Sequence, residues 1–173
     1  TINIADASLT SVNLPSILTN SEPKTLTGTM WGGNLSVLSA LAGSEYLPRI
    51  KDGIVFLEDV GEQAYRIERM LYDLYLAGVF KVQQAIVFWA LSGSGEDSYD
   101  KRYDVATVIR QLHQLTGLPI YSGMRFGHIA QKHSFPLGAT CQISTNTAGG
   151  YQLMFSDYPT IKAVAIYVEG LWQ

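Results

Sequence analysis

Two carboxylates in this sequence have the type and the position that acid–base chemistry needs. Glu58 and Asp59 follow directly on the apolar run Ile54–Leu57, which has the length and composition of a buried strand. A strand end holds a side chain rigidly, while the adjoining loop exposes that side chain to a substrate. The same carboxylates could instead cap the helix entered at Glu62, so position alone leaves a catalytic and a structural interpretation open.

His128 is the histidine best placed to act as a general base near neutral pH. It follows Gly127, and a glycine allows the backbone to approach closely and to aim the ring into a cleft. A turn histidine that satisfies a backbone carbonyl is the structural alternative. His113 is expected at the surface or boundary of a helix, and His133 is expected to be a polar neighbour of Pro136.

The sequence contains no motif for a metal site, a phosphate-binding loop or a serine nucleophile. Its three histidines and one cysteine show no HExxH or CxxC spacing, so no metal site is expected. The glycines form no GxxxxGK[ST] or GxGxxG loop, and no cofactor is expected. No serine lies in a GxSxG elbow, so none is identified as a nucleophile. A glutamate and a histidine would then be two parts of a triad without its third.

The composition is that of a globular protein, because 47% of the 173 residues are apolar and 16% are charged. This length suffices for one domain with a sizeable core. The net charge of −3 argues against a nucleic-acid partner. No apolar run reaches the roughly 18–20 residues of a membrane span, so no membrane partner is expected. The single cysteine, Cys141, provides no disulfide framework and permits a reducing compartment.

Helical and strand patterns alternate along most of the chain, and short strands separated by turns close it. This order predicts an α/β domain with a mixed sheet and a small strand-rich C-terminal part. Residues 1–27 are expected to be a polar linker or a remnant of a missing N-terminal domain, and residues 28–173 to form the domain itself. Helices are predicted at 35–42, 62–77 and 103–116, and strands at 54–57, 85–91, from 119, 137–143, 151–155 and 163–168.

Five short motifs, taken together and in order, resemble the LD-carboxypeptidase family of serine peptidases. The resemblance runs from about Thr27 to Ile143 and implies a mixed-sheet, β/β/α-type C-terminal domain of such an enzyme. The motifs are Trp31-Gly32-Gly33-Asn34-Leu35, Gly53–Val60, Tyr65–Leu71, Phe126-Gly127-His128 and Pro136-Leu137-Gly138.

The resemblance implies a two-domain enzyme with a Ser-Glu-His triad. By motif, Glu58 and His128 correspond to its Glu and His, and the nucleophilic serine would lie on an N-terminal domain outside this chain. In such a triad the histidine takes the serine proton and the glutamate orients the imidazole. Trp31 and Asn34 are candidate substrate-binding residues, with core packing and helix capping as their respective alternatives.

The implied reaction is the release of terminal D-alanine from murein tetrapeptides by cleavage of an L,D-peptide bond, during cytoplasmic murein recycling. The expected partners are therefore a muropeptide, the missing N-terminal domain and, because this family tends to dimerise, a second copy of the chain. We expect the chain alone to be inactive. Two alternatives remain open: a related peptidase that cleaves a peptide–nucleotide antibiotic, as in microcin resistance, and a binding or interaction domain that has the fold without the chemistry.

Overall fold

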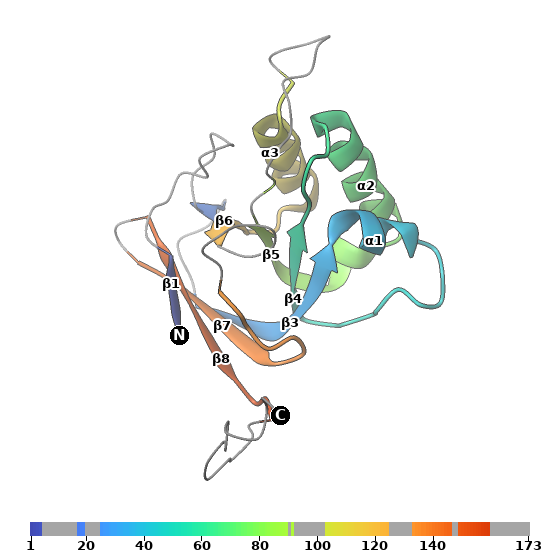
Figure 1. Ribbon diagram of the computed structural model, residues 1–173. Helices are drawn as coiled ribbons and strands as arrows, with labels where there is room; N and C mark the ends of the chain where they lie inside the picture. The colour runs from blue at the N-terminus through green and yellow to red at the C-terminus, as the bar shows by residue number, and fades with distance from the viewer. Residues whose placement is uncertain are drawn as a thin grey trace, which may run out of the picture.

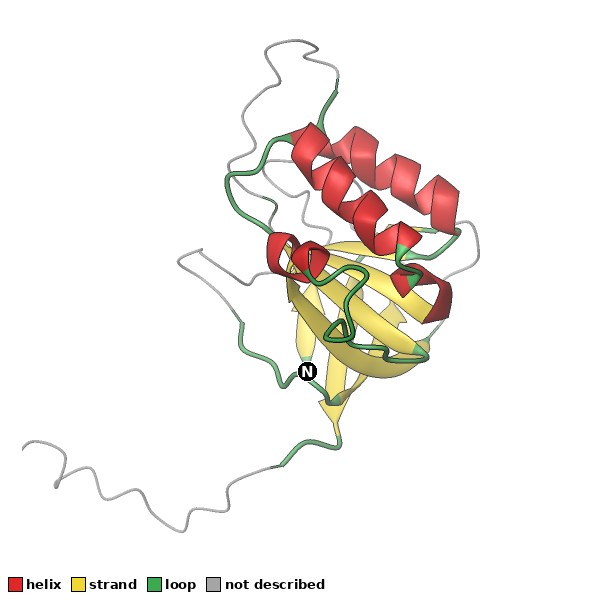
Figure 2. Ribbon diagram, turned by 90° about the vertical axis from the view of Figure 1, so that its right-hand side faces the viewer, coloured by secondary structure: helices red, strands yellow, loops and turns green. Residues whose placement is uncertain are grey.

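The computed structural model describes residues 1–4, 17–19, 25–89, 91, 103–124, 133–146 and 149–159. In these residues a curled mixed sheet is covered on one face by helices (Figures 1 and 2). This arrangement confirms the predicted fold class.

Eight described strands form one sheet. Their bounds are β1 (Ile2–Ile4), β2 (Ile17–Leu18), β3 (Leu26–Asn34), β4 (Gly53–Glu58), β5 (Gln83–Trp89), β6 (Ile120–Met124), β7 (Thr140–Thr145) and β8 (Tyr151–Ser156). The order across the sheet is β1-β8-β7-β3-β4-β5-β6-β2. Strands β3, β4, β5 and β6 run parallel, whereas the flanking pairs are antiparallel. The carboxyl ends of the four parallel strands therefore lie at one edge, where loops can carry functional side chains.

Strand β3 belongs to both parts of the sheet. Its residues 26–29 pair antiparallel with β7, and its residues 30–34 pair parallel with β4. At the change of partner, Met30 donates its N–H to the carbonyl of Ala139 (3.0 Å) and accepts from the N–H of Gly138 (2.9 Å). Beyond this point β7, β8 and β1 swing away from the parallel strands, as Figure 1 shows.

The helices of the described residues, three α-helices and a short 3-10 helix, lie on the outer face of the sheet (Figure 2). They are α1 (Leu35–Ala40), α2 (Ala64–Leu76), η1 (Val79–Val82) and α3 (Val105–Thr116). Asp104 starts α3, because its carboxylate accepts from the N–H of Thr107 at 2.7 Å. Gly78 follows α2 and Gly117 follows α3, both with positive φ, the conformation that glycine tolerates at a helix end.

The two faces of the parallel strands bury separate apolar clusters. On β4, Val55 and Leu57 pack with the helices, while Ile54 and Phe56 point into the curl of the sheet. This alternation follows from the two-residue period of a strand. Full burial of each such side chain contributes about 1.5–3 kcal/mol, so both faces stabilise the strand.

The inner cluster includes three titratable side chains that hold their protons tightly. Tyr151 donates its hydroxyl to the carbonyl of Ser122 at 3.0 Å, which ties β8 to β6 across the curl. Burial raises the pKa of the Cys141 thiol to about 12 and the pKa of Tyr121 to about 12. These groups stay neutral in the folded protein because an ion would lose its hydration there.

Most predicted elements are confirmed, with boundaries shifted by a few residues. The helix predicted at 62–77 spans Ala64–Leu76, and the strand predicted at 85–91 spans Gln83–Trp89. The strand predicted at 163–168 lies outside the described residues. Within the N-terminal segment expected to be a linker, the structure places the edge strands β1 and β2.

One expectation about a histidine is wrong. His113 was predicted at the surface or boundary of its helix, yet it is buried. Its Nδ1 donates to the carbonyl of Leu118 at 2.7 Å, beyond the end of α3, and this bond satisfies the ring nitrogen where water cannot. In the described part of the chain, no helix is long and apolar enough to cross a membrane.

Candidate active site

The carboxyl ends of β3 and β4 bring Asn34 and Glu58 side by side. Each is the last residue of its strand, and the two are register partners in the parallel pairing. Asp59 follows immediately, so two carboxylates and one amide meet at this edge of the sheet. Both carboxylates are buried. The strand-end position predicted for Glu58 and Asp59 is confirmed.

Asn34 uses both ends of its side chain. Its Nδ2 donates to Oε1 of Glu58 (3.1 Å) and to Oδ1 of Asp59 (3.4 Å). Its Oδ1 accepts from the N–H of Val37 (3.1 Å) and from the hydroxyl of Ser36 (2.6 Å). The residue therefore caps α1, as the capping interpretation predicted, and at the same time holds the two carboxylates.

Asp59 is fixed by backbone donors. Its Oδ2 accepts from the N–H of Ser36 at 3.0 Å, and its Oδ1 accepts from the N–H of Val60 at 2.9 Å. A carboxylate at the first turn of a helix also interacts favourably with the helix dipole. The capping alternative named the helix entered at Glu62, but Asp59 contacts the first turn of α1 instead. Helix α2 begins after Gln63, whose side chain makes no capping bond.

Glu58 differs from Asp59 in how much of its hydrogen-bonding capacity is used. Among the described residues, the side chain of Glu58 accepts one hydrogen bond, from Asn34. The carboxylate of Asp59 accepts three. A carboxylate that is oriented but not saturated can accept a further donor, such as an imidazole N–H. Of the two neighbours, Glu58 is the one suited to that task.

Trp31 lies in the core, apart from these carboxylates. Its indole is buried beside Gly53, at the opposite end of β4, and its Nε1 donates to Oε1 of Gln83 at 2.7 Å. The Nε2 of Gln83 donates in turn to the carbonyls of Ile50 (2.9 Å) and Val79 (3.2 Å). This is the packing role that the alternative interpretation of Trp31 predicted.

Steric constraints explain why a glycine follows Trp31. Gly32 has a φ of 131°, and a Cβ there would collide with the carbonyl oxygen of Phe56 on the neighbouring strand. A side chain is excluded because β3 and β4 approach closely at this point. The close approach brings the next residues of β3, including Asn34, level with Glu58.

His128 and its neighbours 125–132 lie outside the described residues, so the pair Glu58–His128 stays a prediction. Sequence reasoning missed two contributors to this edge, Ser36 and the donor role of Val60. The serine two residues after a capping Asn34 was the available signal, because small polar side chains recur in the first turn of helices. Among the described residues, no group of three or more His, Cys, Asp or Glu could hold a metal ion.

Residues 27–143 match the model of the LD-carboxypeptidase C-terminal domain. The chain belongs to this family. It is 31% identical to the murein tetrapeptide carboxypeptidase of Pseudomonas aeruginosa over 122 residues, covering 69% of this chain and 38% of that protein. It is 32% identical to the microcin C7 self-immunity protein of Escherichia coli over 122 residues, covering 67% of this chain and 33% of that protein.

A solved structure agrees with this LD-carboxypeptidase assignment. The muramoyltetrapeptide carboxypeptidase of Oxalobacter formigenes superposes with a TM-score of 0.75 at 35% identity, over 83% of this chain and 50% of that chain. This LD-carboxypeptidase domain therefore spans about half of the solved relative and little more than a third of the Pseudomonas aeruginosa protein.

Proposed function

We propose that this chain is the C-terminal half of a serine LD-carboxypeptidase that releases terminal D-alanine from murein tetrapeptides. Glu58 and His128 are the Glu and His of its triad, and the serine lies on an N-terminal domain of the complete protein. The position of Glu58 carries this proposal: it is a buried carboxylate at the end of β4, oriented by Asn34, and among the described residues its carboxylate accepts no other hydrogen bond. The similarity to two murein or muramoyl tetrapeptide carboxypeptidases supports the substrate.

The chemistry assigns one task to each residue. His128 takes the proton of the serine hydroxyl as the hydroxyl attacks the peptide carbonyl, and then gives that proton to the leaving amine of D-alanine. Glu58 accepts the N–H of the other ring nitrogen, which selects the tautomer and stabilises the imidazolium. Asn34 holds the carboxylate of Glu58 at the strand end (3.1 Å). Water then hydrolyses the acyl-enzyme by the same steps in reverse order.

Asn34 and Trp31 were also expected to contact the substrate. For Asn34 we retain this as a proposal, because its amide lies beside Glu58 at the strand end. For Trp31 the buried hydrogen bond to Gln83 supports a packing role, so any effect of Trp31 on the substrate would act through the position of β3. Action in the cytoplasm and assembly as a homodimer are further proposals, and both rest on the family resemblance.

The first test measures D-alanine release from a murein tetrapeptide by the complete protein, by its His128→Ala variant and by this chain alone. We expect release by the complete protein only, because the chain lacks a recognisable nucleophile and the variant lacks the general base. Release by the isolated chain would place the nucleophile within these residues. Unchanged turnover of the variant would remove His128 from the mechanism.

A second substrate class has a specific observation in its favour. The microcin C7 self-immunity protein matches this chain about as well as the murein peptidase does, at 32% and 31% identity. The alternative function is therefore cleavage of a peptide–nucleotide antibiotic with the same triad. Assaying both substrates side by side separates the two. Cleavage of neither by the complete protein would favour a binding domain that has the fold without the chemistry.

A further inference from the structure

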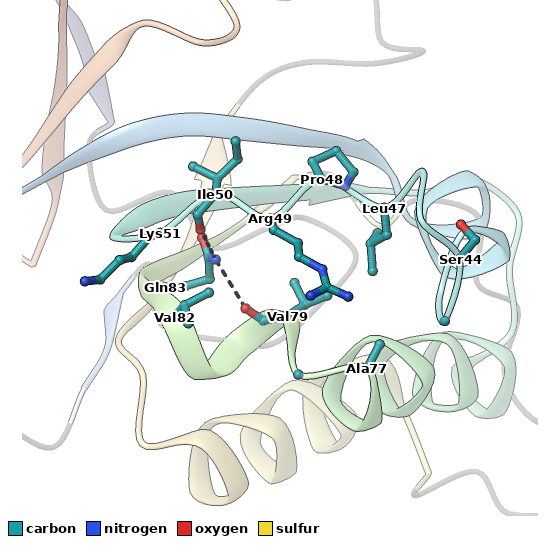
Figure 3. A pocket seen from close by; sticks show the side chains of 12 residues that line it. Ser44, Leu47, Pro48, Arg49, Ile50, Lys51, Ala77, Val79, Val82 and Gln83 are labelled. Carbon is teal, nitrogen blue, oxygen red and sulfur yellow. Dashed lines mark hydrogen bonds between the residues drawn. The ribbon is translucent and has the colours of Figure 1, made fainter.

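A cavity of about 420 Å³ opens at the amino ends of β4 and β5, between the loop 43–51 and the segment 77–83 (Figure 3). Its size is in the range of sites that bind small organic molecules. Strands rise about 3.3 Å per residue, so the two ends of β4 lie roughly 17 Å apart, with Glu58 at the far end. None of the residues that line the cavity belongs to the hydrogen-bond network around Glu58.

Half of the residues that line the cavity have apolar side chains. Leu47 and Val79 are buried, and their side chains continue the core that packs under the helices. Val82 is 43% exposed at the wall. A ligand with an apolar body would gain about 25 cal/mol for each Å² of apolar surface removed from water here. The apolar lining residues are Leu47, Pro48, Ile50, Ala77, Val79 and Val82.

One buried side chain fixes the two walls relative to each other. Gln83 donates from Nε2 to the carbonyl of Ile50 in the loop and to the carbonyl of Val79 in η1, and both bonds are drawn in Figure 3. Its Oε1 is occupied by the indole of Trp31. The cavity is therefore held open by a satisfied network, and little reorganisation would be needed on binding.

The charged residues that line the cavity are both basic. Arg49 and Lys51 are among its lining residues, and no lining residue is acidic. In Figure 3 the guanidinium of Arg49 reaches over the hollow towards Val79, whereas Lys51 points away from it. Among the described residues Arg49 forms no ion pair. A guanidinium beside an apolar surface binds carboxylates well, because its fork of N–H donors matches their two oxygens.

We propose that this cavity binds a small organic carboxylate. The apolar body lies against Leu47 and Val79, and the carboxylate accepts hydrogen bonds from the guanidinium of Arg49. The site is independent of the peptidase proposal, because it shares no residue with the network around Glu58 and its test uses no turnover.

Ligand-observed NMR titrations of the complete protein test this proposal with three probes. The probes are 4-phenylbutyrate, 4-phenylbutanol, which has the same apolar body without the charge, and inorganic phosphate. We expect 4-phenylbutyrate to bind at one site, and the other two about tenfold more weakly, because each lacks one of the two features that the cavity recognises.

Charge-removing and cavity-filling variants locate the site. Arg49→Gln should weaken 4-phenylbutyrate about tenfold and leave 4-phenylbutanol unchanged, because only the carboxylate uses the guanidinium. Arg69→Gln is the matched control: it removes the same charge from an exposed position of α2 and should change nothing. Val82→Trp places a large side chain in the cavity and should abolish binding of both compounds. If this variant does not fold, Ala77→Leu, which also enlarges a lining side chain of the segment 77–83, replaces it in the experiment.

Several results would overturn the proposal. These are no binding of 4-phenylbutyrate, equal effects of Arg49→Gln and Arg69→Gln, or full binding by the Val82→Trp protein in its folded form. Phosphate that binds as tightly as 4-phenylbutyrate would also overturn it, since the apolar wall would then contribute nothing.

Discussion

The two ends of β4 are each organised by one carboxamide, and they use it differently. At the carboxyl end, Asn34 donates to two carboxylates and leaves Glu58 able to accept another donor. At the amino end, Gln83 accepts from the indole of Trp31 and donates to two carbonyls, so its polar atoms are all occupied. The same chemical group thus orients a reactive side chain at one end and fixes the packing at the other.

The two ends of β4 should therefore respond differently to mutation, one in turnover and the other in stability. A change at Glu58 should alter turnover more than folding, because among the described residues its carboxylate accepts one hydrogen bond only. Changes at the amino end should alter folding more than turnover, because buried polar atoms would lose their partners.

The largest expected effect is on turnover, at Glu58. Glu58→Gln keeps the size of the side chain but cannot stabilise an imidazolium, so D-alanine release by the complete protein should fall by a factor of about 10³ or more. The melting temperature should stay close to that of the wild type. Glu68→Gln makes the same chemical change on α2 and should keep full activity. Equal turnover of the two variants would exclude Glu58 from the triad.

The next effect is on stability, at Gln83. Gln83→Leu keeps the volume but leaves the indole N–H of Trp31 and the carbonyls of Ile50 and Val79 without their partner. We expect the free energy of unfolding to fall by about 3 kcal/mol, as measured by urea denaturation. Turnover per folded molecule should be unchanged. A stability loss below about 1 kcal/mol would mean that water replaces these bonds.

A smaller loss of stability is expected at Gly53. A Cβ at this position would lie 2.6 Å from Oε1 of Gln83 and 2.7 Å from Nε1 of Trp31, so Gly53→Ala must push these two atoms apart. We expect a loss of about 2 kcal/mol, typical of overpacking a dense core. In the Gln83→Leu background the Ala substitution should cost less, because the hydrogen bond that it disturbs is already absent. Simple additivity of the two changes would contradict this account.

The smallest loss of stability is expected at Asn34. Asn34→Ala removes the side chain that caps α1 and that donates to Glu58 and Asp59. We expect the free energy of unfolding to fall by about 1 kcal/mol in urea denaturation, the usual loss when a capping side chain is truncated. The control is Asn34→Ser, which keeps a capping oxygen and should lose less. Equal losses for the two variants would mean that the cap contributes nothing.

Local patterns sufficed to predict most of the fold. The strand at 54–57 and the helix at 62–77 are confirmed because the strand is buried along its length and the helix buries one face, and both patterns are read directly from the sequence. The order of strands across the sheet could not be predicted, because β7 pairs with β3 through residues far apart in sequence. The burial of His113 was not predicted, since the bond that satisfies its ring nitrogen goes to the carbonyl of Leu118, beyond the end of the helix.

The candidate site was predictable in part for the same reason. Glu58 stands at the end of a strand that the sequence shows, so its place follows from one element. The role of Asp59 depends on where α1 lies relative to β4, and that requires the tertiary structure. Trp31 belongs to a motif with Asn34, but it lies three residues, or about 10 Å, nearer the amino end of β3. Its indole is buried against Gln83, and the motif does not reveal which of its residues reach the strand end.

Because β3 pairs with both β4 and β7, its two halves should find their partner strands at different times during folding. Its second half pairs with β4, which follows closely along the chain, so the parallel part can form from neighbouring segments. The first half of β3 pairs with β7, which is synthesised much later. The curled part of the sheet cannot form before β7 is available. Until closure, the backbone of residues 26–29 is an unpaired edge that could join a strand of another molecule. Slow closure of long-range pairs should therefore limit the folding rate, and nascent chains of this protein should be most prone to aggregation just before β7 emerges.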